Sequence, residues 1–187
     1  SHVDDILTRG HRQAAAAFWA AAATRFGVKI WDIVDYDNPL VYCAKRISKL
    51  NREGQVWYTL DQTEDIRVFL EDHGMSTARA QHAPMPDKHE ISSDPELATA
   101  QEHKMYRSQV GSLMYFTETR NDIMYEVSRL SQGIAAPTKG HMKALRRVMA
   151  YLNTVPDMRL CVPRVAGDTW HIYSDSDHAG DTTVGTN

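Results

Sequence analysis

The sequence predicts an α+β fold in which a short antiparallel β-hairpin precedes a series of amphipathic helices. Two runs rich in β-branched and aromatic residues, LVYCAKRI and VWYTL, flank the turn sequence NREG with its glycine Gly54. Three segments within residues 96–157 carry apolar residues at helical spacing. No segment repeats with a period of roughly 20–50 residues, which excludes a solenoid.

Composition and charge restrict the class of protein further. The 187 residues suffice for one domain or for parts of two, and 42% of them are hydrophobic and 24% charged, as in ordinary globular proteins. Because the net charge is −3, contact with nucleic acid would have to come from a local basic patch. The longest apolar run, Ala14–Ala23, is much shorter than the about 20 residues that cross a membrane, so we expect no membrane partner.

The cysteines and the first residues bear on location. Cys43 and Cys161 lie far apart and have no C-x-x-C spacing, which fits a reducing compartment. The first residues lack the basic region and apolar region of a secretory signal. We therefore expect an intracellular location, in the cytoplasm or the nucleus.

The first predicted helix precedes the hairpin and is rich in alanine. The stretch RQAAAAFWAAAATRFG predicts a helix because alanine has the highest helix propensity, and Gly27 would end it. Its only large anchors are Phe18 and Trp19. Since burial stabilises by about 25 cal/mol per Å² of apolar area, we expect this helix to dock weakly.

The second predicted helix follows the hairpin within LDQTEDIRVFLEDHG. Asp61 and Glu64 form a D-x-x-E pattern, which predicts a capping box at its start. A common apolar face is formed by Ile66, Phe69 and Leu70. Gly74 is the expected residue just after the helix.

A linker rich in proline, aspartate and serine over residues 83–95 then leads to three more predicted helices. They lie within residues 102–118, 119–133 and 137–156, the second starting at a T-x-x-D pattern from Thr119 to Asp122. The segment 158–175 predicts two short strands around a turn at Gly167–Asp168.

The order of several motifs carries a resemblance to a known family. The segments YRSQVGSLMYFTETRNDIMYEVSRLSQ, PTKGHMKALRRVMAYL and YSDSDHAGD resemble the C-terminal part of the Pol polyproteins of copia-type retrotransposons. VDDIL is similar to the Asp-Asp motif of the family's polymerase, and LDQTEDIRVFLEDHGM with APMP is similar to the thumb segment that follows. The resemblance implies a fragment of a reverse transcriptase that runs into the start of a ribonuclease H.

The resemblance also implies a division of the chain. Residues 1–60 would form part of the reverse-transcriptase palm, with the Ala-rich helix and the β-hairpin. Residues 61–95 would hold the thumb helix and a linker, and residues 96–157 a helical connection. Residues 158–187 would contain the first strands of a ribonuclease H-like domain, truncated at its start.

Two sets of aspartates correspond to catalytic, metal-binding positions of the family. Asp4 and Asp5 match the polymerase pair, and Asp175 matches the first carboxylate of the ribonuclease H site. Both reactions use pairs of divalent ions, and Mg²⁺ prefers such oxygen ligands. Because consecutive strand residues point to opposite faces, Asp4 and Asp5 could converge only at a hairpin tip.

Simpler interpretations of these acids remain. Asp4 and Asp5 could lie in an exposed turn or at a helix N-terminus, and Asp175 in a polar loop with Asp177 and Asp181. The family's other metal ligands come from segments outside these residues. We therefore expect Mg²⁺ binding to be weak or absent, and no polymerase or nuclease activity from the chain alone.

A basic stripe predicts contact with nucleic acid. It consists of Lys139, Lys143, Arg146 and Arg147, which share one side of the last helix. In the intact enzyme this stripe could follow the phosphates of an RNA/DNA primer–template duplex, although a solvated helix face gives the same pattern. LVYCAKRI corresponds to the family's hairpin that holds the primer end, with Ala44 where glycine is usual.

Two classes of function follow from these observations. The first is a polyprotein fragment whose partners are the duplex and the missing upstream polymerase and downstream ribonuclease H segments. The second is a helical module that binds nucleic acid or protein without catalysis. Salt-dependent affinity for a duplex would distinguish a binding module from an inactive relic.

Overall fold

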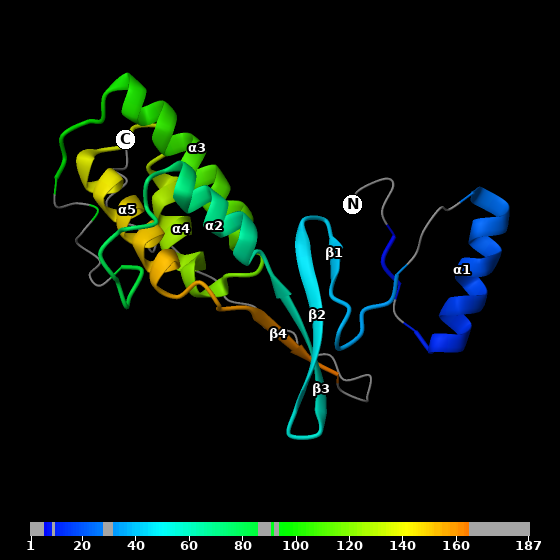
Figure 1. The fold of residues 1–187 in the computed structure, drawn as a ribbon. Coiled ribbons are helices and arrows are strands. Elements are labelled where there is room, and N and C mark those ends of the chain that lie inside the picture. Colours follow the sequence, from blue (N-terminus) through cyan, green and yellow to red (C-terminus); the bar gives the residue numbers. More distant parts are fainter. Residues whose placement is uncertain (1–5, 9, 28–31, 86–90, 92–93, 165–187) are drawn as a thin grey trace, which may run out of the picture.

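A computed structural model describes residues 6–8, 10–27, 32–85, 91 and 94–164. A four-stranded sheet lies between a bundle of helices and a separate N-terminal helix (Figure 1). Asp4, Asp5 and Asp175, on which the predicted metal sites depend, lie outside the described residues. Among the described residues, no helix is long and apolar enough to cross a membrane.

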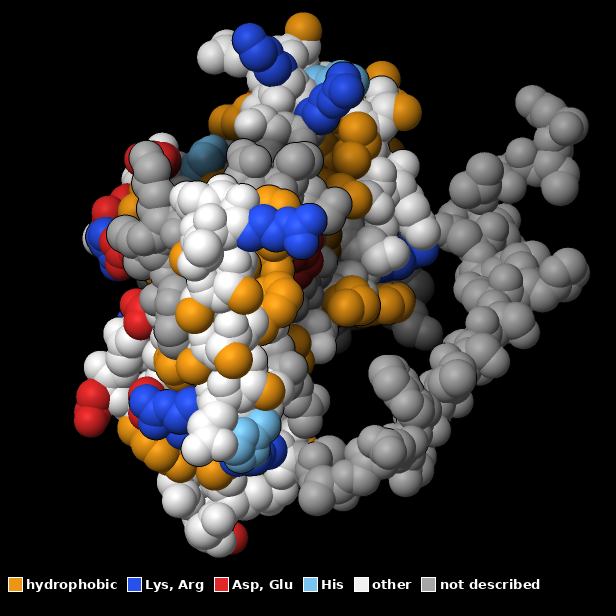
Figure 2. Space-filling model, turned by 90° about the vertical axis from the view of Figure 1, so that its right-hand side faces the viewer, with side chains coloured by type: hydrophobic (Ala, Val, Ile, Leu, Met, Phe, Trp, Pro, Cys, Tyr) orange, Lys and Arg blue, Asp and Glu red, His pale blue; other side chains and the backbone are white. Residues whose placement is uncertain are grey.

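The N-terminal helix α1 (Arg12–Phe26) forms as its alanine content predicts. It ends at Gly27, whose φ of 65° places it in the left-handed region that glycine adopts readily. Trp19 is the only buried residue of α1, and its Nε1 donates to Thr8 Oγ1 at 3.0 Å. Phe18 remains 54% exposed. Figure 2 shows hydrophobic side chains at the surface of the side that faces the viewer.

The sheet is antiparallel throughout, with the spatial order β1-β2-β3-β4. Its strands are β1 (Leu40–Tyr42), β2 (Lys45–Arg52), β3 (Gln55–Asp61) and β4 (Leu160–Pro163). The predicted hairpin around NREG is confirmed as β2 and β3. Its two turn residues, Glu53 and Gly54, have positive φ, and Asn51 Oδ1 accepts the Gly54 N–H at 2.9 Å.

Strand β4 returns to this sheet after all the helices. Leu160 pairs with Leu60 and Pro163 with Trp57, so β4 extends the hairpin at the edge of β3. The sequence places residues 158–187 at the start of a separate domain, with β4 paired to a later strand across Gly167–Asp168. The described part of that segment is a strand of the hairpin sheet, and the later residues lie outside the described ranges.

The helical bundle holds the buried core. Its elements are α2 (Thr63–Asp72), α3 (Ala100–Phe116), the short 3₁₀ helix η2 (Asn121–Ile123), α4 (Met124–Gln132) and α5 (Lys139–Thr154). All four predicted helices of this region are thus confirmed. The predicted apolar face of α2, Ile66, Phe69 and Leu70, is buried among side chains of α3, α4 and α5.

Helix α2 starts differently from the prediction, whereas it ends as predicted. The capping box expected at Asp61 and Glu64 is wrong, because α2 begins after Gln62 without a side-chain cap. Asp61 Oδ1 accepts only the N–H of Thr63, at 3.4 Å. At its other end, Gly74 and Met75 donate to Glu71 and Leu70 and close the helix as expected of a glycine there.

Two capping boxes occur that were not predicted from the sequence. Thr99 with Glu102 begins α3, and Thr138 with His141 begins α5. The T-x-x-D start from Thr119 is also wrong. Its hydroxyl donates to Gln62 Oε1 at 2.8 Å, and the 3₁₀ helix begins after Arg120.

Candidate nucleic-acid interface

The predicted basic stripe lies on α5, but its four members have different surroundings. Lys139 Nζ donates to both carboxylate oxygens of Glu102, at 2.8 and 2.9 Å. This contact holds the pKa of Lys139 above its ordinary value and lowers the pKa of Glu102 to about 2. Lys139 therefore joins α5 to α3 and is not a free cation for a phosphate.

The other three basic residues follow along α5. Lys143 and Arg146 are exposed, whereas Arg147 is partly buried. The stripe that the sequence predicts as four equivalent cations is thus reduced to an exposed pair, Lys143 and Arg146, between a structural lysine and a partly buried arginine. An exposed pair can still contact neighbouring phosphates, since such contacts need positive charge and reach.

The predicted metal sites stay predictions. In the described ranges, no group of three or more histidine, cysteine, aspartate or glutamate residues lies close enough to hold a metal ion. The aspartates that the family resemblance assigns to Mg²⁺ lie outside those ranges.

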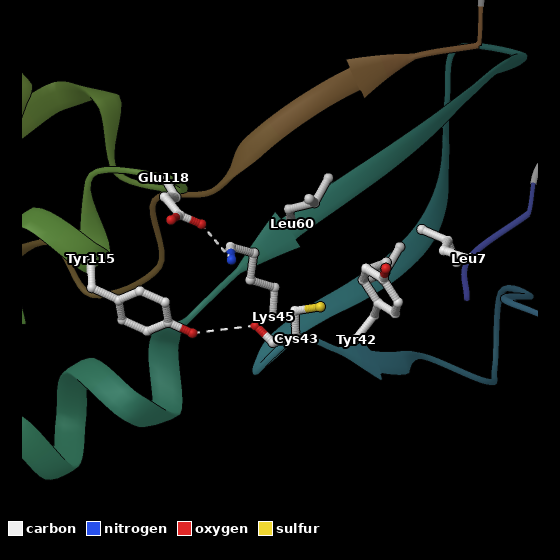
Figure 3. A pocket seen from close by; sticks show the side chains of 8 residues that line it. Leu7, Tyr42, Cys43, Lys45, Leu60, Tyr115 and Glu118 are labelled. Atoms are coloured by element: carbon white, nitrogen blue, oxygen red, sulfur yellow. Dashed lines mark hydrogen bonds and ion pairs between the residues drawn. The ribbon is translucent and has the colours of Figure 1, made fainter. Parts of the chain in front are cut away.

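A second site lies where the β1–β2 turn meets the end of α3. It is a pocket of about 480 Å³ whose apolar wall is formed by the side chains of Leu7, Tyr42, Ile47 and Leu60. Its polar end is formed by Cys43, Lys45, Tyr115 and Glu118. In Figure 3, Tyr115 and Glu118 point from the helical side toward the turn and Lys45.

The turn at this site has an unusual backbone. Its two residues, Cys43 and Ala44, have φ values of 48° and 56°, in the left-handed region that side chains with a Cβ disfavour. A two-residue turn between right-twisted strands requires these values. The Tyr115 hydroxyl donates to the Cys43 carbonyl oxygen at 3.2 Å and so fixes the turn against α3.

Lys45 follows the turn and connects it to the bundle by charge. Its Nζ forms an ion pair with Glu118 and lies 5.2 Å from the centre of the Tyr115 ring. The hydrogen bond with Glu118 raises the pKa of Lys45 above its ordinary value. The Lys45 side chain is 17% exposed and that of Glu118 is 52% exposed, so solvent reaches this pair mainly from the Glu118 side.

A buried polar contact lies next to this ion pair in the sequence. The Thr119 hydroxyl donates to Gln62, which joins the turn after α3 to the residue between β3 and α2. Arg120 is 1% exposed and forms a two-pronged ion pair with Asp122, at 2.9 and 2.8 Å. Although burial would raise the pKa of Asp122, the Arg120 guanidinium holds it below its ordinary value.

The residue pattern predicted LVYCAKRI as one β run, which the structure divides into β1, the Cys43–Ala44 turn and β2. The family resemblance implied a hairpin in this segment, but the partners of its turn were not predicted. Residues 115–119 contact Cys43, Lys45 and Gln62, which lie more than 50 positions earlier in the chain. Alternation along β2 places Lys45 and Lys49 on the same face as Ile47. Two lysines on a half-buried face indicate that acidic partners lie elsewhere in the chain. No local sequence pattern identifies Glu118 as the partner of Lys45.

Comparison with known proteins identifies the family. The Pol polyprotein of transposon RE2 from Arabidopsis thaliana is 36% identical over 187 residues, which cover 97% of this chain and 12% of that protein. The one from transposon RE1 of the same plant is 34% identical over 183 residues, covering 96% of this chain and 12% of the relative. The chain is homologous to part of the retrovirus-related Pol polyproteins of copia-type transposons.

The chain matches only a small part of each of these polyproteins. The Pol polyprotein of transposon TNT 1-94 from Nicotiana tabacum is 27% identical over 190 residues, again 96% of this chain but 14% of the relative. This Pol homologue therefore spans about an eighth of the length of the curated relatives. No model of a protein family matches the chain, and no solved structure matches it.

Proposed function

We propose that this Pol homologue is the part of a copia-type reverse transcriptase that follows the catalytic Asp-Asp motif and leads into ribonuclease H. In this proposal, β1 to β3 belong to the palm, α2 to the thumb, and α3 to α5 to the connection. The order of the motifs along the sequence supports it, together with the similarity of nearly the whole chain to Pol polyproteins.

The role of these residues in that enzyme is to hold an RNA/DNA primer–template duplex. The observation that supports this role is the β1–β2 turn, which Tyr115 and Lys45 fix against the bundle. A turn that is held in place before the duplex arrives costs less free energy to engage than a loose one, because it does not have to be ordered on binding. Lys143 and Arg146 add exposed positive charge on α5.

Asp4 and Asp5 would hold Mg²⁺ for nucleotidyl transfer, and Asp175 would do so for ribonuclease H. Bound Mg²⁺ stabilises the charge that develops on the attacking and leaving oxygens. Both sites require further carboxylates from elsewhere in the polyprotein, according to the resemblance. For these 187 residues by themselves, the proposal is therefore duplex binding without nucleotidyl transfer.

The test is binding of a fluorescent RNA–DNA hybrid, followed by anisotropy at several salt concentrations. We expect the dissociation constant to rise with salt. The double variant Lys143→Met/Arg146→Met should reduce the slope of log Kd against log salt by about one for each phosphate that the protein no longer neutralises. The matched control is Lys104→Met/Arg107→Met, which removes two exposed cations from α3.

Four results would contradict the proposal. Affinity that does not depend on salt would exclude phosphate contacts, and an equal loss in the α3 control would show that only net charge matters. Extension of a primer by the chain with Mg²⁺ would show that its residues also suffice for catalysis. Binding to a protein but not to the hybrid would favour the alternative of a protein-binding module.

A further inference from the structure

Two lysines of β2 have nearly identical surroundings but different partners. Lys45 and Lys49 lie on one face of the strand, and their side chains are 17% and 19% exposed. Each forms an ion pair with one carboxylate and lies over one tyrosine ring, 5.2 Å from the centre of Tyr115 for Lys45 and 4.2 Å from that of Tyr36 for Lys49.

The two arrangements differ in what they connect. Lys49 pairs at 3.0 Å with Asp35, which lies shortly before β1 in the chain, so this pair stays within the sheet region. Lys45 pairs with Glu118, in the turn after α3, so that pair joins the sheet to the helical bundle. The Lys49 pair is therefore an internal reference for the Lys45 pair.

The junction between sheet and bundle contains the buried Gln62–Thr119 hydrogen bond and two accessible contacts at the β1–β2 turn, the Lys45–Glu118 ion pair and the hydrogen bond from Tyr115 to Cys43. Gln62 and Thr119, which are hydrogen bonded to each other, are 3% exposed, so neither salt nor a ligand can readily reach them. Glu118, the adjacent residue, has a side chain that is 52% exposed. An ion pair open to solvent is screened by salt and can exchange its partner, whereas the buried hydrogen bond keeps the two parts joined.

We propose that the Lys45–Glu118 pair is a releasable latch, which holds the β1–β2 turn against α3 and which the phosphates of a bound nucleic acid open by replacing Glu118 as the partner of Lys45. A phosphate carries negative charge and accepts hydrogen bonds as a carboxylate does. The Gln62–Thr119 contact then acts as the pivot. The role of the nucleic acid rests on the proposed function, whereas the latch itself does not.

The experiment measures the distance between the turn and the bundle. Spin labels are attached at Val41→Cys on β1 and Lys104→Cys on α3, both exposed positions, in the whole chain with Cys43→Ser and Cys161→Ser. Pulsed electron resonance gives the distance distribution. We expect Glu118→Gln and Lys45→Met each to shift it to longer distances, and the matched control Asp35→Asn to leave it unchanged.

Addition of the RNA–DNA hybrid tests the second half of the proposal. A saturating hybrid, with binding followed by anisotropy, should shift the distribution of the parent protein to that of Glu118→Gln. It should leave the Glu118→Gln variant itself unchanged. Far-ultraviolet circular dichroism verifies that each variant keeps its helices.

The outcomes separate the latch from the function. An unchanged distance in both Glu118→Gln and Lys45→Met would overturn the latch, and so would an equal shift in Asp35→Asn. Binding of the hybrid without any shift would overturn the competition for Lys45. Failure of the hybrid to bind would overturn the proposed function and the competition, while the variants without hybrid would still decide the latch.

Discussion

The carboxylate of Glu102 lies 2.8 Å from the ammonium group of Lys139, and this ion pair joins the first turn of α3 to the first turn of α5. Glu102 also accepts the N–H and the hydroxyl of Thr99, so one carboxylate closes a capping box and an ion pair together. This relationship converts one member of the predicted nucleic-acid stripe into a structural residue, and two predictions follow from it.

Lys139→Met should lower the midpoint of thermal unfolding without weakening duplex binding. The reason is that Lys139 is already paired, whereas Lys143 and Arg146 are exposed. Differential scanning calorimetry and anisotropy on the same samples measure both quantities. Lys143→Met is the control and should show the reverse pattern. Loss of affinity in Lys139→Met equal to that in Lys143→Met would contradict the assignment.

The stability that Glu102 contributes should disappear in acid. Its pKa is lowered to about 2 in the folded chain, first by the bond from Lys139, and a carboxylate with a lowered folded pKa stabilises above its unfolded pKa of about 4.3. This contribution is lost as the pH falls from about 4 toward 2. Urea unfolding at several pH values should show that the free energy of unfolding falls less with decreasing pH in Glu102→Gln than in the parent. An identical fall in the two proteins would refute the prediction.

His141 should make the chain less stable below neutral pH. Its Nδ1 accepts the N–H of Thr138, and burial lowers its pKa, so the folded chain prefers the neutral ring. Protonation then favours the unfolded state, and stability that is complete above pH of about 6.5 declines as the pH falls below it. His141→Gln keeps a capping side chain and should remove this decline.

The control for His141 is an exposed histidine. His82→Gln, outside the bundle helices, should retain the decline of the parent. Chemical unfolding between about pH 7 and 5, which spans the ordinary titration of histidine, distinguishes the variants. A decline of equal size in His141→Gln would assign it to other groups.

Ala44→Gly should stabilise the chain. A residue with a Cβ in the left-handed region costs about 1–2 kcal/mol, and glycine recovers this, less the entropy that it adds to the unfolded state. We expect a net gain of about 0.5–1 kcal/mol in the free energy of unfolding. Ala135→Gly, at an exposed alanine without a positive φ, is the matched control and should bring no gain.

Asp122→Ala should be the most damaging of these substitutions. It leaves the buried guanidinium of Arg120 without its carboxylate, which typically costs about 3–5 kcal/mol. Glu71→Ala, which removes the partner of Arg67 on the exposed side of α2, should reduce the free energy of unfolding far less. Urea unfolding compares the two, and similar losses would mean that Arg120 finds another partner.

Periodicity, alanine content and glycine positions were sufficient to predict the helices and the β2–β3 hairpin. The apolar spacing of Ile66, Phe69 and Leu70 requires one buried face, and Gly27, Gly54 and Gly74 mark turns where φ is positive. These features depend on neighbours in the sequence, which is why they can be read from it.

The capping patterns show the limit of that reasoning. Both D-x-x-E at Asp61 and T-x-x-D at Thr119 have the right residue types. Yet Asp61 Oδ2 lies 4.0 Å from Arg159 Nε, and the Thr119 hydroxyl donates to Gln62, so both side chains contact residues far away in the sequence. Conversely, the box at Thr138 uses a histidine in a position where glutamate or glutamine is expected. The Lys45–Glu118 pair also joins distant residues, so no local pattern contains it.

The return of β4 to β3 has a consequence for synthesis on the ribosome. Leu60 and Leu160 are neighbours in the sheet, but the whole helical segment is made between them. During translation the outer edge of β3 therefore stays open until the last helix has emerged, and an open edge can pair with another nascent chain. Ribosomes stalled between α5 and β4 should carry the most aggregation-prone form of this polypeptide.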